Sequence, residues 1–346
     1  MLTRLAILMT LLLVVVGCTT EDNPLPDADG DGDGDADGDG DGDGDGDGDG
    51  DGDGDGDGDG DGDGDADGDG DGDVVCDQGV WSGDYTISDH ASMAALEGYV
   101  EITGYLNIEA PDVTELSGLD CLRTVEGVGI QESAALVNLS GLGSLTEAQA
   151  VWCEHNSSLT SLSGLEALTR LGGLHIEWCS SLTSLSGLEE VTALRSLYVE
   201  GGSSLTEISG LNVQETVEIH MNDSLTIVEM SSLTSTVAIT GNGALTSVDL
   251  GSVTNLDGGG LHINDNDALT TFEGLESLTT AVELSISDND SLEQLGLSSL
   301  THVEGEFNIS GNPTLPTCEA ESLLAQLDTT PEYVTISEND DSGICE

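Results

Sequence analysis

Aromatic and imidazole rings gather beside glutamates in three successive segments of a chain that has only ten Phe, Trp and Tyr residues. The group consists of Trp152, His175, Tyr198, Trp178, Glu154, Glu177 and Glu200. Such rings stack on sugars or cover cations, and carboxylates bind polar groups or a metal ion. The same rings would also stabilise neighbouring strands by packing across them, so a binding patch and plain cross-strand packing are both open interpretations. Glutamates about 5 Å apart repel each other, which costs stability unless a cation or an arginine intervenes.

The sequence offers little for catalysis. It contains no Ser, His and Asp constellation, no glycine loop that would cradle a phosphate and no regular His and Cys spacing for a metal. A calcium-dependent polysaccharide enzyme on a β-helix needs a basic residue near its carboxylates. Beyond Arg4 the chain has only Arg123, Arg170 and Arg195, and we expect all three to lie outside the strand faces. We therefore predict a protein that is not an enzyme and has no cofactor and no metal site, with the polysaccharide enzyme as a less favoured alternative.

These residues belong to a repeat of about 23 residues with the pattern apolar-x-Ile/Val-x-x-Asn-x-x-Leu. Its Ile slot is filled by Ile108, Ile130, Cys153, Ile176, Val199, Ile219, Ile239, Ile263, Ile286, Ile309 and Ile336. A fixed period of about 20–29 residues is typical of a solenoid, whose coils are too small to bury their own apolar faces and must stack. We predict a mainly β protein that folds as a right-handed parallel β-solenoid of about ten coils, with short capping helices.

Each slot of the repeat has a physical role. In Leu174-His175-Ile176-Glu177 the alternation predicts a strand with Leu and Ile inward and His and Glu outward. Equivalent strands then lie about 4.8 Å apart in a parallel sheet. An Asn three residues after the Ile slot tolerates a tight turn there, and its amide can bond open backbone groups as a ladder between coils. Asn fills this slot at Asn156, Asn222, Asn242, Asn266, Asn289, Asn312 and Asn339.

The repeated Leu-x-Ile-x-x-Asn-x-x-Leu core resembles the receptor L-domain family, the leucine-rich-like solenoids of insulin and growth-factor receptor ectodomains, in a bacterial lipoprotein form. The resemblance covers residues 88–346 and includes the final coil, Phe307-Asn-Ile-Ser-Gly-Asn-Pro-Thr-Leu-Pro-Thr-Cys318. It implies extracellular binding rather than catalysis and names no ligand. A typical L domain has fewer coils, and two coils here shorten to 20 residues, so a plain leucine-rich repeat or another parallel β-helix is the alternative.

The ends of a solenoid expose strand edges and core, so caps are expected. We predict capping helices over residues 88–96 and 319–327. Cys318 and Cys345 are placed to clamp the second helix with a disulfide, and Cys76 with Cys121 is the expected bridge at the other end. Two cysteines remain. Cys153 fills an Ile slot and Cys179 an Asn slot, and this offset favours buried free thiols over a bond between them.

The N-terminus predicts export and a lipid anchor. Residues 1–17 have Arg4 followed by an apolar run, which is typical of a secretory signal peptide. The stretch Val15-Val16-Gly17-Cys18 resembles the lipobox of bacterial lipoproteins, in which the Cys is diacylated and becomes the first residue. A cleaved signal with an incidental Cys18 is the alternative. The expected location is the outer membrane or cell surface, with the lipid on Cys18 as the contact with the membrane.

Residues 18–75 form an acidic spacer before the predicted solenoid at 76–346. Every odd position from 27 to 73 is Asp, 24 in all, and Gly fills most of the others. Such a segment builds no core and is expected to be disordered, although weak Ca²⁺ binding is a possible side property. Without these 24 charges the formal net charge of −65 is still −41, and the chain has no Lys. This charge disfavours nucleic acid as a partner and leaves an extracellular protein or glycan. We predict a recognition or adhesion protein, with a structural envelope protein that has no specific ligand as the alternative.

Overall fold

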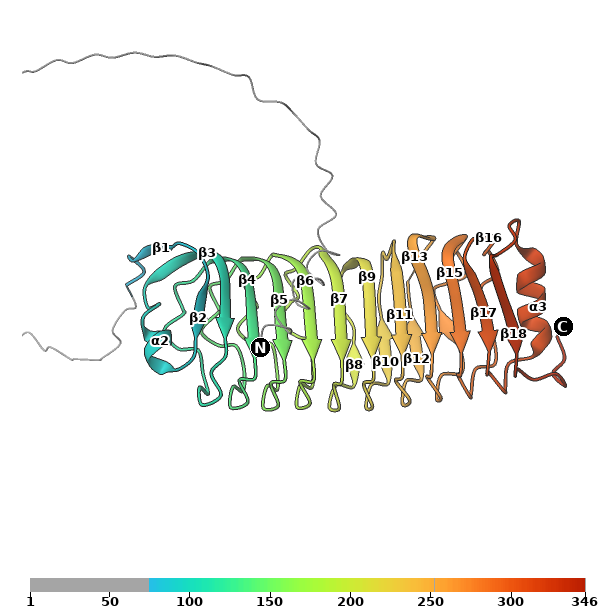
Figure 1. Ribbon diagram of the computed structural model, residues 1–346, viewed down its shortest axis with the longest axis horizontal. Coiled ribbons are helices and arrows are strands. Elements are labelled where there is room, and N and C mark those ends of the chain that lie inside the picture. The colour runs from blue at the N-terminus through green and yellow to red at the C-terminus, as the bar shows by residue number, and fades with distance from the viewer. Residues whose placement is uncertain (1–74, 252, 346) are drawn as a thin grey trace, which may run out of the picture. The chain divides into compact units, whose positions relative to one another are not determined.

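The computed structural model describes residues 75–251 and 253–345. The expected signal peptide at 1–17, the lipidation site Cys18 and nearly all of the acidic spacer lie outside the described residues. The described chain is mainly β and forms a parallel β-solenoid of about 11 turns, as predicted from the repeat (Figure 1). No helix in these two described ranges is long and apolar enough to cross a membrane.

The main face of the solenoid is a 14-stranded sheet in which each coil contributes a strand that pairs with the next coil (Figure 1). Along the sheet the strands follow the order β1 (Gly79–Trp81), β3 (Tyr99–Ile108), β4 (Thr124–Gln131), β5 (Glu147–Glu154), β6 (Arg170–Glu177), β7 (Leu194–Glu200), β9 (Val213–His220), β11 (Thr236–Thr240), β13 (Asn255–Asn264), β15 (Thr280–Ser287), β17 (Glu306–Ser310) and β18 (Tyr333–Ser337). Two short strands pair beside this path, β2 (Tyr85–Ile87) with β3 and β16 (His302–Val303) with β15. All of these pairings are parallel.

A second, smaller sheet forms where the coils turn back. Its four strands are β8 (Glu207–Ile208), β10 (Ile227–Glu229), β12 (Ser247–Asp249) and β14 (Phe272–Glu273), in the order β14-β12-β10-β8. Between the two sheets the Leu and Ile slots fill one continuous core, in which the Ile slot from Ile108 to Ile309 is at most 1% exposed. Register therefore follows the repeat, because a slip of one residue would turn every Ile outward.

A column of left-handed residues turns the chain at the end of each main strand. The residue two positions after the Ile slot has φ between 50 and 73° in every coil from the second onward, at Glu132, His155, Trp178, Gly201, Met221, Gly241, Asp265, Asp288, Gly311 and Glu338. From Glu132 to Gly311 the N–H groups of this column donate to the next coil, as in Trp178 to the carbonyl of Glu200 at 2.9 Å. Each Asn lies in the tight turn, as in Asn266, whose carbonyl accepts from the N–H of Leu269 at 3.0 Å, and the left-handed residue directly precedes it.

The buried asparagines form the expected ladder between coils. In Asn266 the side-chain oxygen accepts from the backbone N–H of Asn242 at 3.1 Å, and Nδ2 donates to the carbonyl of Ile239 at 2.9 Å. Nδ2 also donates to the carbonyl of Asn264 at 2.9 Å. Each Asn from 222 to 312 repeats this pattern and is fully buried. One amide thus satisfies three backbone groups that water cannot reach.

Four coils carry another residue in the asparagine slot, Pro111, Ser133, Cys179 and Gly202, and the last three have different consequences. Ser133 keeps part of the pattern, since its hydroxyl donates to Ile108 and accepts from the N–H of Ala110. Cys179 donates from Sγ to the carbonyls of Cys153 at 3.4 Å and Glu177 at 3.6 Å, which are the positions that an Asn amide would reach. Gly202 has no side chain to offer, so the ladder is interrupted between the coils of Cys179 and Gly202, whereas the N–H of Gly202 still donates to Oδ1 of Asn222 at 2.9 Å.

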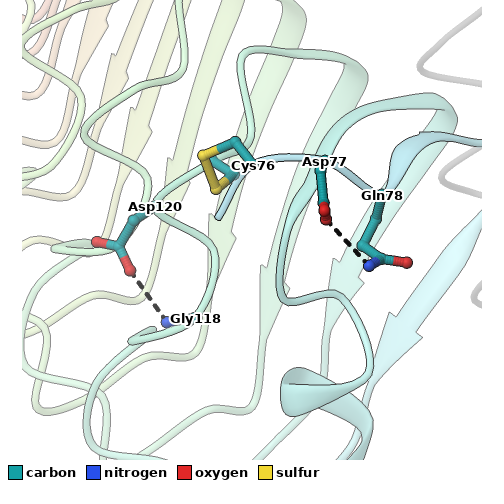
Figure 2. Close-up of a disulfide and its surroundings, with 6 residues drawn as sticks. Cys76, Asp77, Gln78, Gly118 and Asp120 are labelled. Carbon is teal, nitrogen blue, oxygen red and sulfur yellow. Dashed lines mark hydrogen bonds between the residues drawn. A yellow bond between two sulfur atoms is a disulfide. The ribbon is translucent and has the colours of Figure 1, made fainter. Parts of the chain in front are cut away.

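Both ends of the solenoid carry a short helix and a disulfide. The first helix is α2 (His90–Ala94), shorter than the expected 88–96, and Asp89 and Ser92 form its capping box. The second is α3 (Thr317–Gln326), where 319–327 was expected. The predicted disulfides Cys76–Cys121 (Figure 2) and Cys318–Cys345 are both present, with Cα atoms 5.4 and 6.1 Å apart. Cys153 and Cys179 are free and buried, as predicted.

Replacing Asn266 with Ala should destabilise the solenoid strongly. The change leaves the N–H of Asn242 and the carbonyl of Ile239 buried without these partners, so we expect a loss of about 2–5 kcal/mol in the free energy of unfolding. The matched control is Asn308→Ala, because Asn308 bonds only the side chains of Ser285 and Ser310 on the outer surface. Urea unfolding followed by circular dichroism measures both, and a control loss above about 1 kcal/mol would contradict the assignment.

Candidate functional site

The predicted patch lies on the outer surface of β5, β6 and β7, in the register that the repeat implies. Trp152 pairs with His175 and His175 with Tyr198, so the three rings occupy adjacent strands. The rings directly precede the Ile slot and the glutamates directly follow it, where Glu154 pairs with Glu177 and Glu177 with Glu200. The structure therefore brings together the residues that the sequence analysis selected.

Two rings of this row stack on each other along the solenoid axis. His175 and Tyr198 are parallel, with centroids 4.4 Å apart and planes 5° apart. Tyr198 also contacts His220 at 5.6 Å, and Trp152 contacts Tyr105 at 5.8 Å. Since the stacked faces of His175 and Tyr198 are used against each other, these two rings present mainly their edges to a ligand. Cross-strand packing accounts for this part of the patch.

Tyr105 and His220 extend the row beyond the three coils that were selected from the sequence. A Cβ on Gly127 would lie 2.8 Å from the Trp152 ring and 3.0 Å from the Tyr105 ring, so the two rings meet above a glycine that leaves them room. Tyr105 lies three residues before its Ile slot, whereas Trp152 lies one residue before its own. Both positions point outward, so the alternation of the strand would have identified Tyr105 as an outward ring. His220 occupies the glutamate row, opposite Glu200.

The carboxylates of the row each have a partner within their own coil. Glu154 lies 3.3 Å from Nδ1 of His155, and Glu177 lies 3.2 Å from Nε2 of His175. The hydroxyl of Tyr198 donates to Glu200. We expected a cation or an arginine to offset the repulsion between the stacked glutamates. Instead, imidazole and phenol groups bond to these carboxylates.

Trp178 differs from the other rings because it lies on the corner of the solenoid with one face on a glycine. Its backbone is left-handed, with φ of 53°, and the indole covers Gly201, where a Cβ would come within 2.5 to 2.9 Å of three ring atoms. The side chain remains 43% exposed. Met221, two coils further along the same left-handed column, is also exposed, at 49%. An indole held flat with its outer face in solvent suits a sugar or a cationic group.

The arginines differ from the expectation. Arg170 begins β6 and Arg195 lies within β7, so the prediction that both avoid the strand faces was wrong. Arg170 pairs with Glu147 on β5 at 3.1 Å, and Arg195 lies 3.3 Å from Glu215 on β9. The strands begin several residues earlier than the apolar alternation indicates, and this places the two cations at the start of the strands, whereas the rings and glutamates lie at the end.

The two free cysteines do not resemble a reactive pair. Burial raises the pKa of the Cys153 thiol well above its usual range and raises that of Cys179 to about 11, so both remain protonated. Within the two described ranges, no group of three or more His, Cys, Asp or Glu side chains is arranged to hold a metal ion. The cysteines act as core residues and, in Cys179, as a substitute for the ladder amide.

A cavity of about 410 Å³ lies away from the ring row. Its lining comes from the turn segments 183–189 and 206–211, on the side of the solenoid that carries β8. The second segment belongs to the first of the two coils that shorten to 20 residues, so the cavity lies where a longer coil meets a shorter one. The lining side chains are mainly Ser, Thr, Glu and Leu.

The pKa of Tyr198 predicts a pH dependence of stability. Burial and the bond to Glu200 raise this pKa above the usual 10.0, so the folded protein holds the phenol proton more tightly than the unfolded chain. The resulting stabilisation is complete below about pH 10 and is lost as pH rises above it. The unfolding free energies of wild type and Tyr198→Phe, measured from pH 8 to 11, should differ by a constant amount up to about pH 10 and the wild type should then lose more. Equal slopes would contradict the raised pKa.

No protein-family model matches this chain, and no curated protein matches it in sequence. The candidate site is therefore defined by its own geometry, an exposed indole on a glycine corner beside a row of paired glutamates.

Proposed function

We propose that this chain is a non-enzymatic lipoprotein of the cell envelope, of the receptor L-domain type, that presents its solenoid for recognition or adhesion. The observation that carries the proposal is the position of Trp178. Its indole lies on Gly201 and is 43% exposed, and its backbone N–H is bonded to Glu200 in the glutamate row. A large apolar ring held in solvent by a left-handed backbone is costly for folding alone, which favours a role in binding.

The ligand is a protein or a glycan that combines a flat apolar or cationic group with hydrogen-bond donors. The indole would contact the apolar face of a sugar or the side chain of an Arg or Lys. Glu177 and Glu200 would accept hydrogen bonds from sugar hydroxyls or pair with the cation. The formal charge of −41 outside the Asp-Gly tract would attract a basic protein, and a divalent cation would assist the binding of an acidic glycan.

The N-terminal sequence supplies the anchor in this proposal. A lipid on Cys18 would hold the protein to the outer membrane or cell surface, and the acidic spacer would hold the solenoid away from it, with weak Ca²⁺ uptake as a side property. The disulfides Cys76–Cys121 and Cys318–Cys345 fit an oxidising compartment outside the cytoplasm.

The stacking of His175 on Tyr198 favours a second candidate, a structural envelope protein with no specific ligand. In that case the ring row serves only to join the coils. The two candidates differ in what Trp178 does, since its outer face takes part in no ring contact among the described residues.

Replacing Trp178 with Gly should remove binding without loss of stability. Glycine adopts the left-handed backbone without strain and already fills the same slot at Gly201 and Gly241. We expect the full-length protein to retain ligands on a glycan array or in a pull-down of envelope proteins, with or without calcium, and the variant to bind at least about tenfold more weakly, as for a central aromatic contact.

The matched control is Asp288→Gly, which makes the same backbone change at a coil far from Trp178. It should bind like the wild type, and both variants should melt at or slightly above the wild-type temperature. If the wild type bound no ligand in either assay, or if Trp178→Gly bound as well as the wild type, the recognition role would be refuted and the structural role favoured.

A further inference from the structure

The C-terminal end of the solenoid is less completely covered than the N-terminal end. Val334 in β18 is aligned with Phe307 and occupies an inward slot, yet it is 46% exposed, whereas Phe307 is fully buried. At the other end, Tyr85 of β2, aligned with Leu106 in the same slot as Val334, is half-buried, and Ile87 is fully buried beneath a cap that includes Met93 and Leu96. Exposed core is therefore a property of this end and not of solenoid ends in general.

The backbone of β18 has a free edge. Tyr333 donates its N–H to Gly305, and the carbonyl of Ser337 accepts from Gly311, so alternate residues of β18 bond towards β17. In a parallel pair the backbone groups of the residues between them point the other way. The N–H and C=O of Val334 and Ile336 consequently face away from β17, and β18 has no second strand neighbour among the described residues.

Helix α3 does not close this edge. Its buried residues are Ala320 and Leu323, and Gln326 donates to the carbonyls of Leu297 and Leu300 at 2.9 and 2.8 Å. These contacts hold the helix against the turn segment of the preceding coil, beside β18 at the end of the solenoid (Figure 1). Tyr333 and Val334, at 64% and 46% exposed, remain uncovered.

The negative charge of the C-terminal end indicates which kind of strand could pair with the free edge of β18. Glu332 and Glu338 flank β18, and residues 312–345 contain seven acidic residues and no Lys, Arg or His. A second copy of this chain would bring like charges together, which disfavours a dimer through this edge. A strand with basic residues at its ends would instead place opposite charges beside Glu332 and Glu338.

We propose that β18 binds an extended segment of a basic partner protein, which adds to the main sheet as its last strand. The partner backbone pairs with Val334 and Ile336, an apolar residue covers Val334, and flanking Lys or Arg side chains meet Glu332 and Glu338. This mode takes its affinity from main-chain hydrogen bonds and its specificity from alternate side chains and charge. The inference is independent of the Trp178 site, because different coils carry the two surfaces.

The test uses the full-length protein and a fluorescent peptide, Lys-Thr-Val-Thr-Val-Thr-Lys, with binding followed by fluorescence anisotropy. We expect saturable binding that weakens as salt is added. The same peptide N-methylated at alternate residues on its pairing edge should bind at least about tenfold more weakly, since it loses main-chain donors. A peptide with Glu in place of both Lys residues should also bind at least about tenfold more weakly.

Two protein variants distinguish peptide binding at the β18 edge from nonspecific binding. Val334→Pro removes an outward-facing N–H from an edge strand while the bonds of residues 333, 335 and 337 to β17 remain, so peptide binding should fall at least about tenfold. The double variant Glu332→Gln and Glu338→Gln keeps the backbone intact and should reduce both the affinity and its salt dependence. The matched control, Asp112→Asn with Glu115→Gln, removes two exposed carboxylates at the N-terminal end of the solenoid and should leave peptide binding unchanged.

Several outcomes would overturn the proposal. Absence of saturable binding to the Lys-flanked peptide would do so, as would equal binding of the N-methylated peptide. Unchanged binding by the double glutamine variant would remove the basis for a basic occupant even if Val334→Pro did not fold. Sedimentation that shows a wild-type dimer which Val334→Pro dissociates would identify a second copy as the occupant and refute the basic partner.

Discussion

The hydrogen bonds of the buried asparagines are the constraint on which the rest of the structure depends. A solenoid coil cannot bury its own apolar face, so it must stack, and stacking places the backbone at each turn out of reach of water. The amide of Asn266 satisfies three such groups, and the left-handed residue before each Asn brings the amide into position. This pair of slots fixes both the spacing and the register of the coils, and therefore the position of every outward side chain.

The ladder fails where the candidate site lies. Cys179 replaces an amide with a thiol, and Gly202 leaves the slot without a side chain. The adjacent Gly201 is the residue that the Trp178 indole covers. Of these two consecutive glycines, Gly202 interrupts the ladder and Gly201 makes space for the exposed indole. Departures from local consistency are expected to concentrate at functional sites, because only function compensates for them. The coincidence of a weak ladder with an exposed ring supports a role for this corner in binding.

The sequence predicted the features that depend on spacing. The period determined the solenoid and the register of Trp152, His175 and Tyr198, since these follow from which residues share a slot. Both disulfides were predicted from the positions of their cysteines beside the expected caps. The sequence did not predict side-chain directions. Spacing alone does not show that His175 and Tyr198 stack face to face or that Trp178 lies on Gly201, because both depend on rotamers and on room left by a neighbour. The strands also begin before the alternation is visible, which is why Arg170 and Arg195 were misplaced.

The acidity of the chain gives the open C-terminal edge a physical explanation. Proteins usually protect an edge strand with a cap, a bulge or charged residues, because an uncovered edge pairs with another copy. Here Glu332 and Glu338 flank five uncharged residues, and no cation lies in the last coil, so repulsion between identical ends replaces the missing cover. Repulsion of this kind discriminates by charge, whereas a helix over the edge would exclude every strand equally. An edge protected only by negative charge stays closed to the chain itself and open to a basic partner, which is a specificity that a complete cap could not provide.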